Sequence, residues 1–171
     1  MKTLMLTAGL GLMALATTAG TCPVMGTAST MACLAETLGF TIPGTAAIPA
    51  VHADRLRASE ATGELAVELA NKGLTPDQLL TNESIENALR VLLAIGGSTN
   101  AVIHLTAIAG RLGKKVSLET LNRLSDTTPM LVNLKPSGTH YMEHFFAAGG
   151  MGAVLRELKP LLHLDCLNIS G

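Results

Sequence analysis

The 171-residue chain is long enough to bury one core, and 48% of its residues are hydrophobic, which indicates a globular domain. With a formal net charge of −1, no Trp, one Tyr and three Phe, it has neither a basic surface for phosphates nor aromatic side chains for stacking bases, so we expect no nucleic-acid partner. Its three cysteines cannot all pair, which argues against a secreted disulfide framework and favours the cytoplasm.

Residues 1–19 form an apolar segment that we separate from the domain. Lys2 and the apolar run behind it have the charge and length of a signal peptide, which leaves open an exported protein cleaved near Ala19. Gly9 and Gly11 interrupt the run, and it is shorter than a membrane span. We therefore expect no membrane association.

Helices are predicted over much of the first half of the domain. Residues 53–72 alternate apolar and charged positions before Gly73, which is typical of an exposed amphipathic helix. Thr75 and Pro76 begin a short helix over 75–80, because a capping side chain precedes a proline that needs no hydrogen-bond donor. A further helix over 82–95 has one apolar side and ends at a glycine pair.

The next segment, 98–112, is apolar on all sides, so we expect it to be the central helix, with His104 as a satisfied core histidine. Strand composition at 130–134 and 167–169 alternates with predicted helices that begin at Ser117 and cover 141–148 and 153–158. The expected fold is α/β, a helix-rich layered domain.

The segment 20–31 places Cys22 before a helix rich in small residues. Free amides at a helix start lower the pKa of a thiol and suit it to metal ligation or nucleophilic attack, although burial as a small hydrophobic residue is the alternative. We interpret Cys33 and Cys166 as packing residues.

The histidines offer a weaker metal signal. His140 and His144 have the spacing that places two imidazoles on one helix face, but they lack the glutamate arrangement of a zinc protease, which favours a surface pair. His52 precedes Asp54 at a helix entrance, where we expect Asp54 to act as a cap.

The segment 96–100 combines a glycine turn with three polar side chains at a helix start. Such a turn presents backbone amides to a carboxylate or phosphate, but it is equally consistent with an ordinary helix stop followed by a cap. The sequence contains no Walker loop, dinucleotide fingerprint or serine nucleophile elbow.

Several blocks, taken in order, resemble the dihydroxy-acid and 6-phosphogluconate dehydratase family. The first is the cysteine motif Gly-Thr-Cys-Pro-Val-Met-Gly-Thr-Ala-Ser-Thr-Met at 20–31. The others are Leu38-Gly39 through Pro43-Gly44, His52 through Arg55, Glu86-Asn87-Ala88, Gly96 through Asn100 with His104-Leu105, Pro136-Ser137-Gly138 and Ala148-Gly149-Gly150. Residues 20–171 are therefore expected to be part of the N-terminal domain of such an enzyme.

This resemblance implies a hydro-lyase that converts a 2,3-dihydroxy carboxylate to a 2-keto-3-deoxy acid with an iron–sulfur cluster, 2Fe–2S or 4Fe–4S, and Mg²⁺. In the intact enzyme, expected to be a homo-oligomer, an open iron would stabilise the departing hydroxyl while a base removes a proton. Cys22 matches a cluster ligand, and we assign Ser98, Thr99 and Asn100 to substrate binding. The segment Gly26 to Met31 is closer to the sugar-acid members, so an aldonate is the preferred substrate.

The chain also departs from the family pattern. It lacks two further cluster cysteines and the block that supplies magnesium ligands, and no catalytic residue is assigned. Because one thiolate cannot hold a cluster that needs about three or four ligands, we expect this chain alone to be inactive. The alternative is an inactive truncated assembly module.

Overall fold

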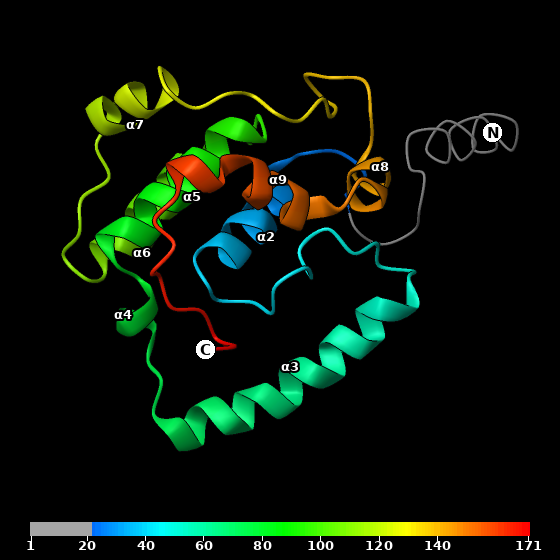
Figure 1. Ribbon diagram of the computed structural model, residues 1–171, viewed down its shortest axis with the longest axis vertical. Helices are drawn as coiled ribbons and strands as arrows, with labels where there is room; N and C mark the ends of the chain where they lie inside the picture. Colours follow the sequence, from blue (N-terminus) through cyan, green and yellow to red (C-terminus); the bar gives the residue numbers. More distant parts are fainter. Residues whose placement is uncertain (1–21) are drawn as a thin grey trace, which may run out of the picture.

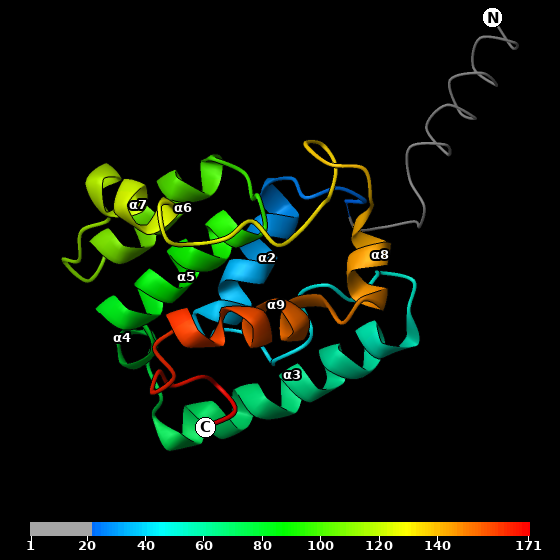
Figure 2. The same cartoon turned by 45° about the horizontal axis from the view of Figure 1, so that its top comes forward.

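The computed structural model describes residues 22–171, so the predictions for the segment 1–19 lie outside the described residues. The described helices are α2 (Thr27–Thr37), α3 (Ala53–Lys72), α4 (Pro76–Leu79), α5 (Asn82–Ala94), α6 (Asn100–Gly110), α7 (Leu118–Ser125), α8 (Met142–Ala147), α9 (Gly150–Leu158) and the 3₁₀ turn η1 (Lys159–Leu161). They are arranged in layers, with α6 and α7 at one edge and α3 at the other (Figures 1 and 2). This confirms the helix-rich layered domain.

Helix α5 is the centre of the core, and α2, α6, α7 and α9 pack against it. Its start is fixed by a reciprocal cap, in which the Thr81 hydroxyl accepts from the Ser84 amide at 3.1 Å and the Ser84 hydroxyl accepts from the Thr81 amide at 2.9 Å. The buried side chains of α5 recur at helical spacing and are Ile85, Ala88, Leu89, Val91, Leu92 and Ala94. Burying such a face supplies most of the stability of a helix in a folded domain.

Helix α6 was predicted to be central, and this prediction is wrong. Only Ala101, Leu105 and Ala109 are buried, on one face, whereas Ile103 is 69% exposed and His104 lies at the surface rather than in the core. Apolar residues around a helix indicate that it can be covered on all sides, but they do not say which element covers it. Here α5 and α2 cover one side.

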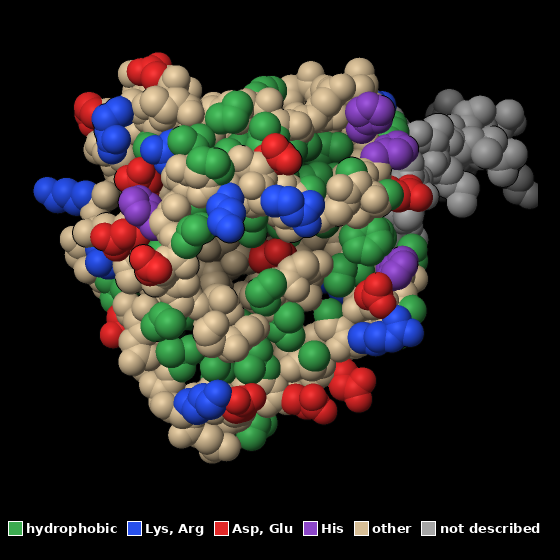
Figure 3. Space-filling view, viewed as in Figure 1, with side chains coloured by type: hydrophobic (Ala, Val, Ile, Leu, Met, Phe, Trp, Pro, Cys, Tyr) green, Lys and Arg blue, Asp and Glu red, His purple; other side chains and the backbone are tan. Residues whose placement is uncertain are grey.

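Helix α3 is the exposed amphipathic helix that the sequence predicts. It buries no residue fully, and Gly73 ends it in a left-handed conformation with φ of 67°. Charged side chains follow its outer edge along the lower margin of Figure 3, with hydrophobic side chains above them. None of the described helices is long and apolar enough to cross a membrane.

The prediction of strands at 130–134 and 167–169 is wrong, because no strand forms among residues 22–171. The amide of Leu131 donates to the Ala94 carbonyl at the end of α5 at 2.8 Å, and the Ile169 amide donates to the Gly39 carbonyl at 2.9 Å. Leu134 forms an isolated bridge with His140. These extended segments meet helix ends and loops rather than a sheet edge, so strand composition alone was insufficient.

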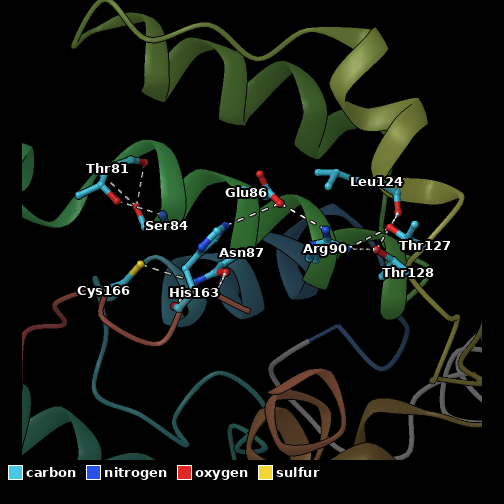
Figure 4. Close-up of polar contacts among 10 residues, drawn as sticks. All are labelled: Thr81, Ser84, Glu86, Asn87, Arg90, Leu124, Thr127, Thr128, His163 and Cys166. Atoms are coloured by element: carbon cyan, nitrogen blue, oxygen red, sulfur yellow. Dashed lines mark hydrogen bonds and ion pairs between the residues drawn. The ribbon is translucent and has the colours of Figure 1, made fainter. Parts of the chain in front are cut away.

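A polar network on α5 holds the chain on both sides of this helix (Figure 4). Asn87 binds the backbone of His163 twice, donating to its carbonyl at 2.8 Å and accepting from its amide at 2.9 Å. Arg90 pairs with Glu86 at 3.3 Å and donates to the hydroxyls of Thr127 and Thr128. The C-terminal segment and the segment after α7 are thereby fixed to one helix.

Candidate functional site

Cys22 lies in a turn that leads into α2, and it is exposed. The turn is held from two sides by a distant segment, because the Met25 amide donates to the Lys135 carbonyl and the Met142 amide donates to the Pro23 carbonyl, both at 2.8 Å. The Ser29 hydroxyl also donates to the Val24 carbonyl at 2.9 Å. Cys22 is therefore a positioned surface thiol, not a packing residue.

The segment 96–100 lies directly against the first turn of α2. The hydroxyls of Thr27 and Ser98 are 3.0 Å apart, and the Asn100 side-chain amide donates to the Thr27 hydroxyl at 3.0 Å. The Ser98 backbone amide donates to the Thr30 hydroxyl, also at 3.0 Å. Two segments about 70 residues apart in the chain thus form one polar cluster, here called the Thr27 cluster and made of Thr27, Thr30, Ser98 and Asn100.

Close packing at this junction explains the second glycine of the pair. A β-carbon on Gly97 would lie 2.7 Å from Thr30 Cγ2 and 2.8 Å from Leu92 Cδ1, which is too close for unstrained contact. The backbone amides of Gly96, Gly97, Ser98 and Asn100 already donate within the chain. This favours the helix stop and cap over an anion site built from these amides.

Of the three residues assigned to substrate binding, the structure brings Ser98 and Asn100 toward the cysteine motif but leaves Thr99 apart. Thr99 is exposed and is the N-terminal boundary residue of α6, where its side chain makes no capping hydrogen bond. Ser98 Oγ instead accepts from the Asn100 amide at 3.3 Å. Ser98 and Asn100 therefore organise the turn as well as facing Thr27.

A cavity of about 590 Å³ opens beside Cys22. Its walls come from the turn and first half of α2, the loop 41–50, the first turn of α3 and the start of α8. Most of the lining is small or apolar, with polar groups from Ser29, Thr41, Arg55 and Glu143. A volume of this size is typical of small-molecule sites.

The comparisons with known proteins match this chain over nearly its whole length. Residues 12–171 fit the model of the dihydroxy-acid/6-phosphogluconate dehydratase N-terminal domain. The chain belongs to this dehydratase family. Its dehydratase relatives include the dihydroxy-acid dehydratase of Caldicellulosiruptor bescii, 47% identical over 154 residues, and dihydroxy-acid dehydratase 1 of Methanosarcina acetivorans, 46% identical over 153 residues.

The chain corresponds to the N-terminal part of such dehydratases. The alignments cover 89% and 90% of this chain but 28% of each relative. The dihydroxy-acid dehydratase of Acetivibrio thermocellus shows the same proportions, 89% and 28%, at 44% identity. The chain thus spans less than a third of the length of the relatives it matches.

The donor set of this dehydratase segment fits one cluster ligand and no complete metal site. Within residues 22–171, no three His, Cys, Asp or Glu side chains are grouped closely enough to hold a metal ion. Cys22 is accessible, whereas Cys33 is fully buried, and burial raises its pKa to about 12. Cys166 is half-buried and 3.6 Å from the Asn87 amide nitrogen, and burial raises its pKa too.

The histidines act as local structural groups. The rings of His140 and His144 are 5.5 Å apart, and His144 Nδ1 accepts from the Tyr141 amide at 3.1 Å, capping α8. At α3 the cap is His52, whose Nδ1 accepts from the Asp54 amide at 3.3 Å. Asp54 was expected to be the cap and instead forms an ion pair with Arg57.

Sequence reasoning missed Glu36, Thr41 and Arg55. Both carboxylate oxygens of buried Glu36 accept from backbone amides, those of Gly44 and Ala46, at 2.8 Å each, and so shape the loop that walls the cavity. Thr41 and Arg55 line the cavity itself. Arg55 belongs to a block that resembles the family, but no spacing signal indicated that it would line the same cavity as Cys22.

Proposed function

We propose that the protein to which this segment belongs is a hydro-lyase that removes water from a 2,3-dihydroxy carboxylate to give a 2-keto-3-deoxy acid. The observation that carries the proposal is the Thr27 cluster, in which Ser98 and Asn100 contact the helix that follows Cys22. Two motifs that resemble the family, distant in sequence, therefore meet at the first turn of α2, the helix that follows the cavity-lining Cys22. The names of the relatives support the same reaction class.

In this proposal, Cys22 is one ligand of an iron–sulfur cluster. Its thiol is exposed, and the turn that follows it is held by backbone hydrogen bonds at Pro23 and Met25, which suits Cys22 to coordination. A bound cluster with an open iron supplies Lewis-acid stabilisation of a departing hydroxyl. The other cluster ligands and those of Mg²⁺ are assigned to no residue of 22–171, in keeping with the absence of a three-ligand group there.

The preferred substrate is a sugar acid, an aldonate, and this rests on the motif from Gly26 to Met31. Ser29 of this motif lines the cavity, where its hydroxyl oxygen can accept a hydrogen bond from a polyol. The names of the relatives indicate the broader dihydroxy-acid class. Competition between gluconate and 2,3-dihydroxy-3-methylbutanoate for the intact enzyme would rank the two, and tighter binding of the branched acid would overturn the sugar-acid preference.

The alternative is an inactive module that assembles with another chain carrying the missing ligands. It is favoured by the single accessible thiol and by the apolar side chains that α3 exposes. In either case we place the protein in the cytoplasm, as a homo-oligomer acting on a small molecule and not on nucleic acid or membranes. The free thiols of Cys22, Cys33 and Cys166 support a reducing compartment.

The test is anaerobic reconstitution with iron and sulfide of the 171-residue chain, comparing it with Cys22→Ser and the control Cys166→Ser. We expect little stable cluster and no dehydration by the chain alone, and weak iron binding that Cys22→Ser removes and Cys166→Ser retains. Equal iron binding by wild type and Cys22→Ser would overturn the ligand assignment. Dehydration by the purified chain would overturn its expected inactivity.

A further inference from the structure

Two residues that line the cavity beside Cys22 each have a buried polar atom without a hydrogen-bond partner. Thr41 Oγ1 and Arg55 Nε are shut off from solvent and have no hydrogen-bond partner among the described residues, and both residues line the cavity. A buried donor without an acceptor destabilises a fold, so such groups are rare unless a ligand or water satisfies them. Two of them on residues that line one cavity point to an acceptor that binds there.

Arg55 also differs in its charge balance from the nearby Arg57 and from Arg90, the other arginine with a buried Nε. A terminal nitrogen of its guanidinium donates to the Ile48 carbonyl, which anchors the group at the cavity wall. Within the described chain Arg55 forms no ion pair, whereas Arg57 pairs with Asp54 and Arg90 pairs with Glu86. Arg90 also has an unpartnered Nε, but its charge is balanced and it lies outside this cavity.

These features indicate the chemistry of the acceptor. A guanidinium Nε–H and a hydroxyl can both donate to one carboxylate, and the cation balances its single negative charge. The rest of the lining includes Ala28, Ala32, Ala47, Ile48 and Pro49, which suits a short carbon chain. A phosphate dianion fits less well, because one arginine balances only half its charge, and the Glu143 carboxylate, which also lines the cavity, repels a dianion more strongly than a single carboxylate.

We propose that Arg55 and Thr41, after a small side-chain rotation that uncovers Nε and Oγ1, form a subsite for the carboxylate of a small organic acid, whose carbon chain extends along the cavity toward Cys22. The identity of this acid as the dehydratase substrate rests on the proposed function. The subsite itself rests on the two unpartnered donors and on the absence of an ion pair at Arg55 among the described residues. In this proposal Arg55 and Thr41 bind and orient the acid, and neither takes part in a bond-making or bond-breaking step.

The test measures acid binding without iron. The ¹⁵N-labelled chain is titrated with gluconate, with 2,3-dihydroxy-3-methylbutanoate and with the neutral amide of each acid, while the Arg55 Nε–H resonance and the backbone spectrum are followed. We expect at least one acid to move the Arg55 Nε–H signal and to bind roughly tenfold more tightly than its amide. Arg55→Met should abolish this difference, and Thr41→Val should weaken binding roughly fivefold.

Arg57→Met is the matched control, because Arg57 lies on the same turn of α3 but outside the cavity. It should bind the acids like wild type. Arg55→Lys, which keeps the charge but removes the Nε–H, guards against misfolding of Arg55→Met and should retain part of the affinity. Equal binding by wild type and a folded Arg55→Met, no preference for acid over amide, or no binding of either acid would each overturn the subsite.

This experiment separates the subsite from the proposed function. Acid binding that requires the carboxylate, together with equal iron binding by wild type and Cys22→Ser, would keep the subsite and reject the cluster ligand. Iron binding that depends on Cys22, together with no acid binding, would keep the cluster ligand and reject the subsite.

Discussion

At the scale of single residues, Gly97 occupies the point where α2 comes closest to the turn after α5. We expect Gly97→Ala to lower the free energy of unfolding by about 1–3 kcal/mol, because Thr30 and Leu92 must move to admit the added carbon. Urea denaturation followed by circular dichroism would measure this. The matched control is Gly110→Ala, since a β-carbon on Gly110 meets nothing within 4 Å. Equal stability of both variants would contradict the close packing.

Cys33 should make the stability of the domain depend on pH in alkaline solution. Its pKa is raised by burial from 9.0 to about 12, so above pH 9 the unfolded chain releases this proton while the folded chain keeps it. Stability from this residue is therefore complete below pH 9 and is lost as the pH rises toward 12. The expected slope is at most about 1.4 kcal/mol per pH unit.

The comparison is between wild type and Cys33→Ala, whose unfolding is measured at several pH values from 8 to about 11. The difference in stability between the two should shrink or reverse as the pH rises, because only wild type contains the buried thiol. Curves that stay parallel over this range would show that Cys33 is less buried than the structure places it.

At the scale of elements, Asn87 connects α5 to the segment after α9. Asn87→Ala removes both hydrogen bonds to the His163 backbone and should cost about 1–3 kcal/mol. Hydrogen exchange should show faster exchange of the His163 amide, with the centre of α5 still protected. Asn122→Ala, at an exposed position of α7, is the control. Unchanged exchange at His163 would contradict the role of Asn87.

The sequence predicted the helices well where their signals are local. Thr75 begins α4 and Gly73 ends α3, because caps and left-handed stops depend on neighbouring residues alone. The strands at 130–134 and 167–169 were wrong, and so were the interior placements of α6 and His104. Each of these depends on which surface the segment meets, and composition does not contain that information.

The candidate site shows the same limit. Cys22 and the segment 96–100 were both singled out, yet their meeting through Thr27 depends on how α2 packs against α5 and α6. Arg55 and Thr41 carry no motif of their own outside the resemblance. They become a pair only because the loop 41–50, shaped by Glu36, turns back toward the start of α2.

At the scale of the whole molecule, α3 leaves apolar side chains in solvent. Leu56 is 75% exposed and Val67 64% exposed, and they lie about three turns apart on the same side of the helix. Exposed apolar surface favours association. We expect sedimentation velocity to show self-association of the chain, which a Leu56→Gln, Val67→Gln variant weakens. Leu118→Gln, at an exposed leucine of α7, should have little effect, and the opposite ranking would locate the contact elsewhere.

The backbone bonds that hold the Cys22 turn have a consequence for the order of events during synthesis. Both partners, Lys135 and Met142, follow more than 100 residues after the cysteine. Contacts so distant in sequence form late, because a long loop must close first. On the ribosome, the thiol emerges early but acquires its place only after α8 has left the exit tunnel. Until then, Cys22 belongs to a segment whose turn has not yet formed.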